Sequence, residues 1–202
     1  YPAWFDVWGQ RHSTVDYKRP AEQLDWMLGQ GVSVSMYMFH GGTNFWYMNG
    51  ANTAGGYRPQ PTSYDYDAPL GEWGNCYPKY YAFREVIQKH LPHGTVLPEV
   101  PADNPTTTFA TIELKESAPL QAAFHQTTES ENVLSMEDLG VDFGYIHYQT
   151  TINKAGKQKL IIQDLRDYAV ILVDGKQVAS LDRRYNQNNV MLDIQKAPAT
   201  LE

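Results

Sequence analysis

The chain has 202 residues, and its 16 Lys and Arg against 23 Asp and Glu give a formal net charge of −7, which argues against a nucleic-acid partner because binding phosphate requires a basic surface. With 42% hydrophobic and 19% charged residues, the composition is typical of a globular protein rather than a disordered one. No apolar run approaches the ~20 residues that span a bilayer, and the single cysteine, Cys76, excludes an internal disulfide.

The first half of the chain predicts α/β structure. Pro20 suits the first turn of a helix whose apolar face ends before Gly29 and Gly31. Residues 32–39, VSVSMYMF, alternate with period two, and both faces are largely apolar or small, as in a parallel strand covered on both sides. A second helix is predicted over residues 78–90. One face of the strand would carry Val32, Val34, Met36 and Met38, and the other Ser33, Ser35, Tyr37 and Phe39.

The composition changes near residue 91. All five tryptophans lie in residues 1–90, whereas residues 91–105 hold four of the twelve prolines. A proline-rich stretch of this kind indicates a linker. We therefore predict an α/β domain over residues 1–90, a linker over 91–105 and a second domain over 106–202.

The second half has short runs typical of strands, separated by turn signals. Asp174 and Gly175, between two apolar runs, indicate a two-residue β-hairpin. Several short strands of this kind predict an all-β domain, either a β-sandwich or a jelly roll. The runs are residues 106–113, 143–152, 157–165, 168–181 and 189–194.

The long loop after residue 39 is the most informative feature for function. It contains GGTNF (41–45), NGAN (49–52) and PTSYDYDAP (61–69). In parallel α/β proteins, ligands bind at the carboxyl ends of strands, which is where this loop begins. Aromatic faces beside Asn, Asp and Thr groups suit a sugar, because its apolar patches stack on rings while its hydroxyls need hydrogen-bond partners. The same aromatic residues could instead be core, the default for tryptophan.

Several polar residues have both a catalytic and a structural interpretation. Asp65 and Asp67 have the spacing of a carboxylate pair on one face, but in proline-flanked loops such residues more often bind turn backbone. His12 is a candidate general base, but no neighbouring motif completes a triad, which favours a structural histidine. Cys76 is interpreted as an inert thiol. Gly41 and Gly42 do not begin a phosphate loop, since no Gly-Lys-Ser/Thr follows.

Three long motifs follow one another along the first half of the chain: WFDVWGQRHSTVD (4–16), SMYMFHGGTNFWYMNGAN (35–52) and QPTSYDYDAPLGEWG (60–74). Together they resemble the β-galactosidases of glycoside hydrolase family 35. The resemblance continues through KYYAFREVIQKH (79–90) and, more loosely, to residue 194. It implies the last part of a (β/α)8 TIM barrel followed by a truncated β-sandwich-like or jelly-roll-like domain.

The resemblance also implies an activity and a site. Members of the family hydrolyse terminal β-galactose with retention, using two carboxylates and no metal or organic cofactor. The resemblance places both carboxylates upstream, the nucleophile two residues before Tyr1, so we expect no catalytic residue here and an inactive fragment. It matches Tyr66 to a residue that hydrogen-bonds galactose beside the nucleophile, and it matches Tyr1, Trp4 and Tyr37 to residues that line the galactose subsite. Tyr37 independently falls on the strand face that would point into the barrel.

Three hypotheses therefore remain for the parent protein. The first is a β-galactosidase that acts on β-galactosides or oligosaccharides, and the second is a non-catalytic galactose-binding or carbohydrate-binding relative. The third is an α+β interaction protein whose aromatic residues are core. By resemblance, an extracellular, lysosomal or periplasmic location is expected. The sequence does not indicate an oligomeric state.

Overall fold

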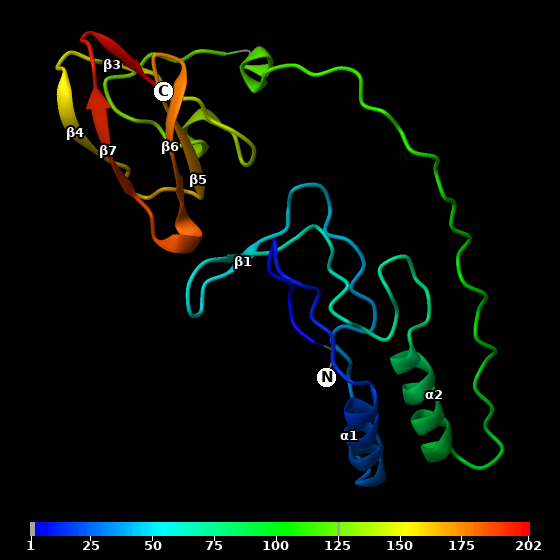
Figure 1. The fold of residues 1–202 in the computed structure, drawn as a ribbon. Coiled ribbons are helices and arrows are strands. Elements are labelled where there is room, and N and C mark those ends of the chain that lie inside the picture. The colour runs from blue at the N-terminus through cyan, green and yellow to red at the C-terminus, as the bar shows by residue number, and fades with distance from the viewer. Residues whose placement is uncertain (1–2, 125) are drawn as a thin grey trace. The chain divides into compact units, whose positions relative to one another are not determined.

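A computed structural model describes residues 3–124 and 126–202, and the chain divides into two compact units, Tyr1–Thr111 and Ile112–Glu202 (Figure 1). The first unit contains two helices and one short antiparallel pair of strands. These elements are α1 (Lys18–Gly29), β1 (Ala51–Asn52), β2 (Arg58–Pro59) and α2 (Pro78–His90).

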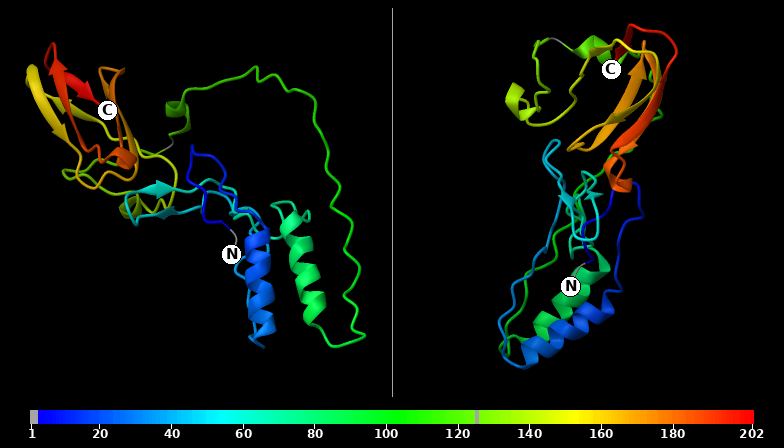
Figure 2. Two further views of the ribbon diagram at one scale, coloured as in Figure 1. Left: turned by 60° about the horizontal axis from the view of Figure 1, so that its bottom comes forward. Right: turned by 90° about the vertical axis from the view of Figure 1, so that its left-hand side faces the viewer.

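The helices α1 and α2 lie side by side, as both views in Figure 2 show. Their shared core is formed by the buried side chains of Ala21, Leu24 and Phe83. Toward the C-terminal ends of the two helices, Asp25 of α1 forms ion pairs with Lys89 and His90 of α2. Both predicted helices are confirmed. In the part of the chain described, no helix has the length and apolar character needed to cross a bilayer.

The predicted strand over residues 32–39 does not form as a paired strand. A strand requires a neighbour that takes up its backbone hydrogen bonds, and no described segment forms a ladder with these residues. Their alternation is nevertheless visible in the packing. Val34 and Met36 pack against the core between the helices, whereas Tyr37 contacts aromatic rings of the long loop. The sidedness predicted from the sequence therefore holds without the ladder.

The second unit is all-β, with antiparallel strands in two sheets (Figure 1). One sheet has the order β3-β8-β5-β6, and the other pairs β4 with β7. A single buried cluster contains Ile171 and Ala199 from the first sheet and Leu192 and Ile194 from the second. The two sheets therefore enclose one core, as predicted for a sandwich. The strands are β3 (Thr150–Ile152), β4 (Gly156–Ile161), β5 (Tyr168–Val173), β6 (Lys176–Asp182), β7 (Asn189–Ile194) and β8 (Ala199–Leu201), with 3-10 turns at Leu120–Ala123, Glu137–Leu139 and Arg183–Tyr185.

The hairpin predicted at Asp174 and Gly175 joins β5 to β6. Both residues have positive φ, 50° and 74°, as a two-residue turn of type I′ requires. The Asp174 carboxylate accepts a hydrogen bond from the backbone N–H of Thr200 at 2.8 Å, which ties the turn to β8.

Three of the predicted β segments are wrong in whole or in part, and one of them, the run 157–165, is a strand only as far as Ile161. Residues 106–113 form no strand, and Phe109 within them is 80% exposed. In the run 143–152, only Thr150–Ile152 is a strand. β-Propensity favours a strand only where a neighbouring strand and a buried face are available, and residues 106–113 have neither among the described residues.

Candidate functional site

Five aromatic side chains from three segments of the first unit meet at one place. The rings of Tyr64 and Tyr66 are stacked, with centroids 5.7 Å apart and an interplanar angle of 7°. Phe5 makes edge-to-face contacts with both, with ring centroids 5.0 Å from Tyr64 and 5.2 Å from Tyr66. We name this group the aromatic cluster, and its members are Trp4, Phe5, Tyr37, Tyr64 and Tyr66.

Tyr66 lies at the centre of the aromatic cluster. Its ring is 5.9 Å from that of Trp4 and 6.4 Å from that of Tyr37, measured between centroids. Tyr66 is 7% exposed, whereas Trp4 and Tyr37 are 61% and 68% exposed. The cluster thus combines one buried ring with two exposed rings.

The structure brings together three of the four residues predicted to line a sugar site, namely Trp4, Tyr37 and Tyr66. The fourth, Tyr1, lies outside the described residues. The prediction missed Tyr64, whose hydroxyl is 2.9 Å from that of Tyr37, and also Phe5. The signal for Tyr64 was present, because its spacing of two from Tyr66 allows both rings to lie on one side of an extended segment.

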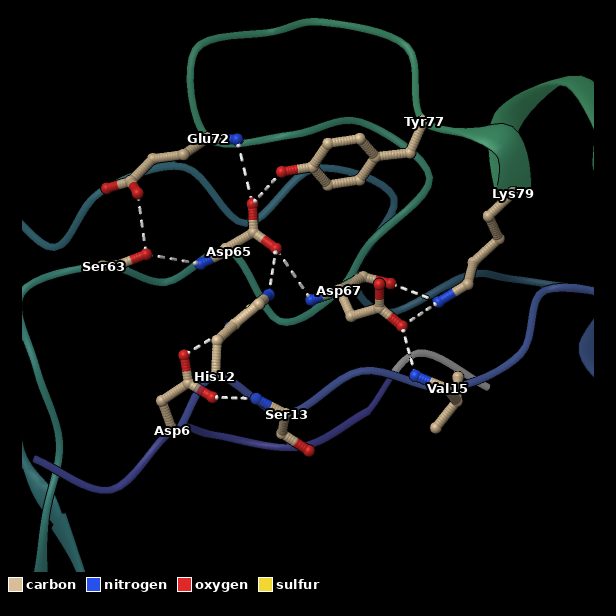
Figure 3. A network of polar contacts seen from close by, with 10 residues as sticks. All are labelled: Asp6, His12, Ser13, Val15, Ser63, Asp65, Asp67, Glu72, Tyr77 and Lys79. Carbon is tan, nitrogen blue, oxygen red and sulfur yellow. Dashed lines mark hydrogen bonds and ion pairs between the residues drawn. The ribbon is translucent and has the colours of Figure 1, made fainter. Parts of the chain in front are cut away.

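The turn that carries Tyr66 has an unusual backbone. Tyr66 and Asp67 both have left-handed conformations, with φ of 62° and 48°. For residues other than glycine this costs on the order of 1–2 kcal/mol each, so surrounding bonds must hold the turn. The carboxylate of Asp65 accepts hydrogen bonds from the backbone N–H groups of Asp67 and Glu72 and from the Tyr77 hydroxyl, at 3.0–3.1 Å (Figure 3).

Asp67 fixes the same turn to helix α2. Its carboxylate lies 2.6 Å from the Lys79 ammonium and accepts a hydrogen bond from the backbone N–H of Val15 at 2.9 Å (Figure 3). Lys79 also donates to the backbone carbonyl of Asp67. Lys79 is almost fully buried, and its partner is therefore required. Both carboxylates therefore hold the turn that carries Tyr66, which is the role that the structural interpretation gives them.

Glu72 links the turn to the start of the long loop. Its two carboxylate oxygens accept hydrogen bonds from Thr43 at 2.6 Å and Ser63 at 2.7 Å. Gly41 lies beside this link, and a Cβ there would overlap the backbone carbonyl oxygen of Tyr64. Only glycine therefore allows this approach between the two parts of the loop. Sequence reasoning did not identify Glu72, because neither partner is near it in the sequence.

His12 joins the polar network around Asp65. Its Nδ1 lies 2.6 Å from Asp6 Oδ2, and its Nε2 lies 3.3 Å from Asp65 Oδ1 (Figure 3). The other Asp6 oxygen accepts from the backbone N–H of Ser13 at 2.7 Å. The hydrogen bond with Asp6 raises the pKa of His12, although partial burial opposes this, and Asp65 and Asp67 raise it further. His12 is engaged by carboxylates, which agrees with the structural interpretation.

Tyr66 and Tyr77 both have a raised pKa. Burial raises the pKa of Tyr66, and Tyr37 adds to the rise. Burial and the hydrogen bond to Asp65 raise the pKa of Tyr77 to about 12. Their hydroxyls are therefore protonated near neutral pH and can donate hydrogen bonds. Among the described residues, no group of three or more His, Cys, Asp or Glu side chains is arranged to hold a metal ion.

Comparison with known families gives two matches that do not overlap. Residues 1–90 match the family described as "Glycosyl hydrolases family 35". Residues 133–202 match the family described as "Beta-galactosidase, first all-beta domain". The first match contains the aromatic cluster and its polar network, and the second contains all six strands of the sandwich.

Individual relatives extend over the whole chain. A beta-galactosidase from Xanthomonas manihotis is 40% identical over 206 residues, covering 100% of this chain and 34% of that protein. A beta-galactosidase from Mus musculus is 41% identical over 217 residues, covering 100% of this chain and 32% of that protein. One from Homo sapiens is 36% identical over 214 residues, covering 100% of this chain and 30% of that protein. The chain thus spans about a third of the length of these relatives.

Proposed function

This chain belongs to glycosyl hydrolases family 35, with the first all-beta domain of beta-galactosidases following the family 35 region, and on that premise we propose that the protein is a retaining β-galactosidase. The intact protein is taken to include the parts that its relatives have beyond this chain. It hydrolyses terminal, non-reducing β-D-galactose residues from β-galactosides or oligosaccharides. Residues 1–90 supply one wall of its galactose subsite.

The observation that carries this proposal is the aromatic cluster, in which a buried tyrosine is flanked by two exposed rings. An exposed indole such as Trp4 can stack on the apolar face of a pyranose, and a neutral phenol such as Tyr66 can donate to a sugar hydroxyl or a nearby carboxylate. Tyr37 is the second exposed ring, and Tyr1 completes the set of residues proposed to line the subsite. The rigid turn that carries Tyr66 supports such a role, because binding sites work best when their groups are held in place beforehand.

The two catalytic carboxylates are proposed to come from outside this chain. A retaining glycosidase needs an acid/base and a nucleophile ~5–5.5 Å apart. The acidic side chains that surround the cluster are engaged elsewhere: Asp65 holds a turn, Asp67 pairs with Lys79, and Glu72 bridges Thr43 and Ser63. Within this chain, these groups position Tyr66 and perform no bond cleavage. The isolated chain is accordingly expected to show no turnover.

The test uses the intact protein with an aryl β-galactoside, followed by NMR of the first sugar released. Hydrolysis that gives the β-anomer first supports a retaining β-galactosidase. Release of the α-anomer would contradict retention. Galactose binding without any turnover would instead support a non-catalytic carbohydrate-binding relative.

An extracellular, lysosomal or periplasmic location is also proposed, on the likeness to this family alone. Fractionation of the source cells and their medium, with activity on the aryl galactoside as the readout, tests it. Activity confined to the cytosol would contradict it.

A further inference from the structure

His12 connects the two segments that carry the proposed galactose contacts. Trp4 lies two residues before Asp6 on one segment, and Tyr66 follows Asp65 directly on the other. The imidazole of His12 lies between these carboxylates, 2.6 Å from Asp6 and 3.3 Å from Asp65 (Figure 3). It is thus a bridge between the Trp4 segment and the Tyr66 turn.

The geometry of this bridge favours the protonated ring. A carboxylate oxygen faces each ring nitrogen, and only the imidazolium has an N–H on both. The charged groups that face the ring are Asp6 on its own segment and Asp65 and Asp67 on the turn, and all three are acidic. Loss of the proton would leave a nitrogen lone pair opposite a carboxylate.

The His12 ring is more exposed to solvent than the two carboxylates that it contacts. The His12 side chain is 42% exposed, whereas those of Asp6 and Asp65 are 13% and 7% exposed. Protons therefore reach the histidine from solvent, and the protonated ring adds a positive charge between two carboxylates that otherwise, among the described residues, accept hydrogen bonds from neutral groups only. Deprotonation would leave two poorly solvated carboxylates on either side of a neutral ring and weaken the contact between their segments.

We propose that protonated His12 is a positioning residue, which holds the Trp4 segment against the Tyr66 turn so that the galactose subsite is assembled only while the ring carries its proton. His12 does not touch the sugar in this account. The inference rests on the proposed function, because it assumes that Trp4 and Tyr66 hold galactose. The bridge is present below the pKa of His12 and is lost as the pH rises through it, so substrate binding should weaken on the alkaline side.

The experiment compares the intact wild-type protein with His12→Gln over a range of pH. The quantity measured is the ratio of their kcat/KM values on an aryl β-galactoside, with KM and kcat reported separately. We expect the wild type to exceed the variant by about tenfold at low pH, mainly through KM, and the ratio to fall toward one as the pH rises. A ratio that is independent of pH would overturn the proposal, because it is what a merely structural role predicts.

A second variant changes a carboxylate that His12 contacts rather than His12 itself. Asp6→Asn removes the nearest carboxylate but keeps the size of the side chain, so the loss of activity should move to lower pH than in the wild type. A fall that stays at the wild-type pH would overturn the proposal. His93→Gln, an exposed histidine after α2, is the matched control and should leave the pH profile unchanged.

The design separates this proposal from the proposed function. If the wild type shows no turnover, the proposed function is wrong, and galactose binding by calorimetry replaces kcat/KM as the readout. Binding that weakens with rising pH in the wild type but not in His12→Gln would then still support the bridge. A wild type that neither turns over galactosides nor binds galactose would overturn both.

Discussion

The buried ammonium of Lys79 on helix α2 lies 2.6 Å from the carboxylate of Asp67, the residue that follows Tyr66. This pair fixes the strained turn of the aromatic cluster to the helix layer of the same unit. The position of the Tyr66 turn thus depends on a residue outside the aromatic cluster.

Lys79→Met should destabilise the protein substantially. The variant leaves Asp67 without its cation in a little-exposed site, and breaking a buried pair typically costs about 3–5 kcal/mol. That loss corresponds to a fall in Tm of roughly 6–20 °C, at about 2–4 °C per kcal/mol, measured by calorimetry on the intact protein. Lys89→Met is the matched control, because Lys89 is 65% exposed in its pair with Asp25, and it should change Tm little. Equal effects of the two variants would contradict the role given to Lys79.

Gly41→Ala should disrupt the loop that carries the cluster. The added methyl group would overlap the carbonyl oxygen of Tyr64, so the two parts of the loop must separate. We expect a lower Tm together with a higher KM for an aryl β-galactoside. Gly50→Ala, in the same loop with nothing within 4 Å of its Cβ, should retain wild-type values. Wild-type kinetics in Gly41→Ala would show that the close approach to Tyr64 is not needed.

Tyr66→Phe removes one hydroxyl and keeps the ring that packs against Phe5, Tyr64 and Trp4. If that hydroxyl binds the sugar or the catalytic nucleophile, kcat/KM should fall by about 1.5–3 kcal/mol, or roughly 10- to 150-fold. Steady-state kinetics on the intact protein measure this. Tyr145→Phe, an exposed tyrosine of the second unit, is the control. An unchanged kcat/KM in Tyr66→Phe would exclude a hydroxyl contact in the rate-determining complex.

Tyr77 should contribute to the loss of stability at high pH. Its pKa is about 12 in the folded chain against an ordinary value of 10.0, so folding favours the protonated phenol. This stabilisation is fully present below pH 10 and is lost as the pH rises toward 12. Urea unfolding at intervals over that range should show a steeper decline for the wild type than for Tyr77→Phe. Parallel declines would mean that burial and the hydrogen bond to Asp65 do not raise the pKa of Tyr77 in solution.

Much of the fold could be predicted from local sequence patterns. The helix predicted over residues 78–90 has those bounds in the structure, and the hairpin at Asp174 and Gly175 forms with the expected positive φ values. Both depend on signals within a few residues, such as Pro78 at the first helical position. The run at residues 106–113 has a β-propensity similar to that of the runs that form strands, but it has no pairing partner among the described residues. Propensity alone does not indicate whether a partner strand is available.

The aromatic residues of the candidate site could be predicted from the sequence, but the charged residues that hold them in place could not. Trp4, Tyr37 and Tyr66 could be named from motifs and from alternation along residues 32–39, and the structure brings them together. Lys79 and Glu72 gave no local signal, because a lysine in a helix and a glutamate in a loop are ordinarily solvated. Their roles arise only in the folded chain, where Lys79 contacts Asp67, which is 12 positions away, and Glu72 contacts Thr43, which is 29 positions away.

We propose that the aromatic cluster forms a wall of a galactose subsite. A crystal structure of the intact protein with bound galactose would show whether it does. We expect the pyranose to stack on Trp4 and the Tyr66 hydroxyl to lie within hydrogen-bond distance of the sugar or of the carboxylate that attacks it. Galactose bound away from both residues, with the cluster unchanged and unoccupied, would contradict it.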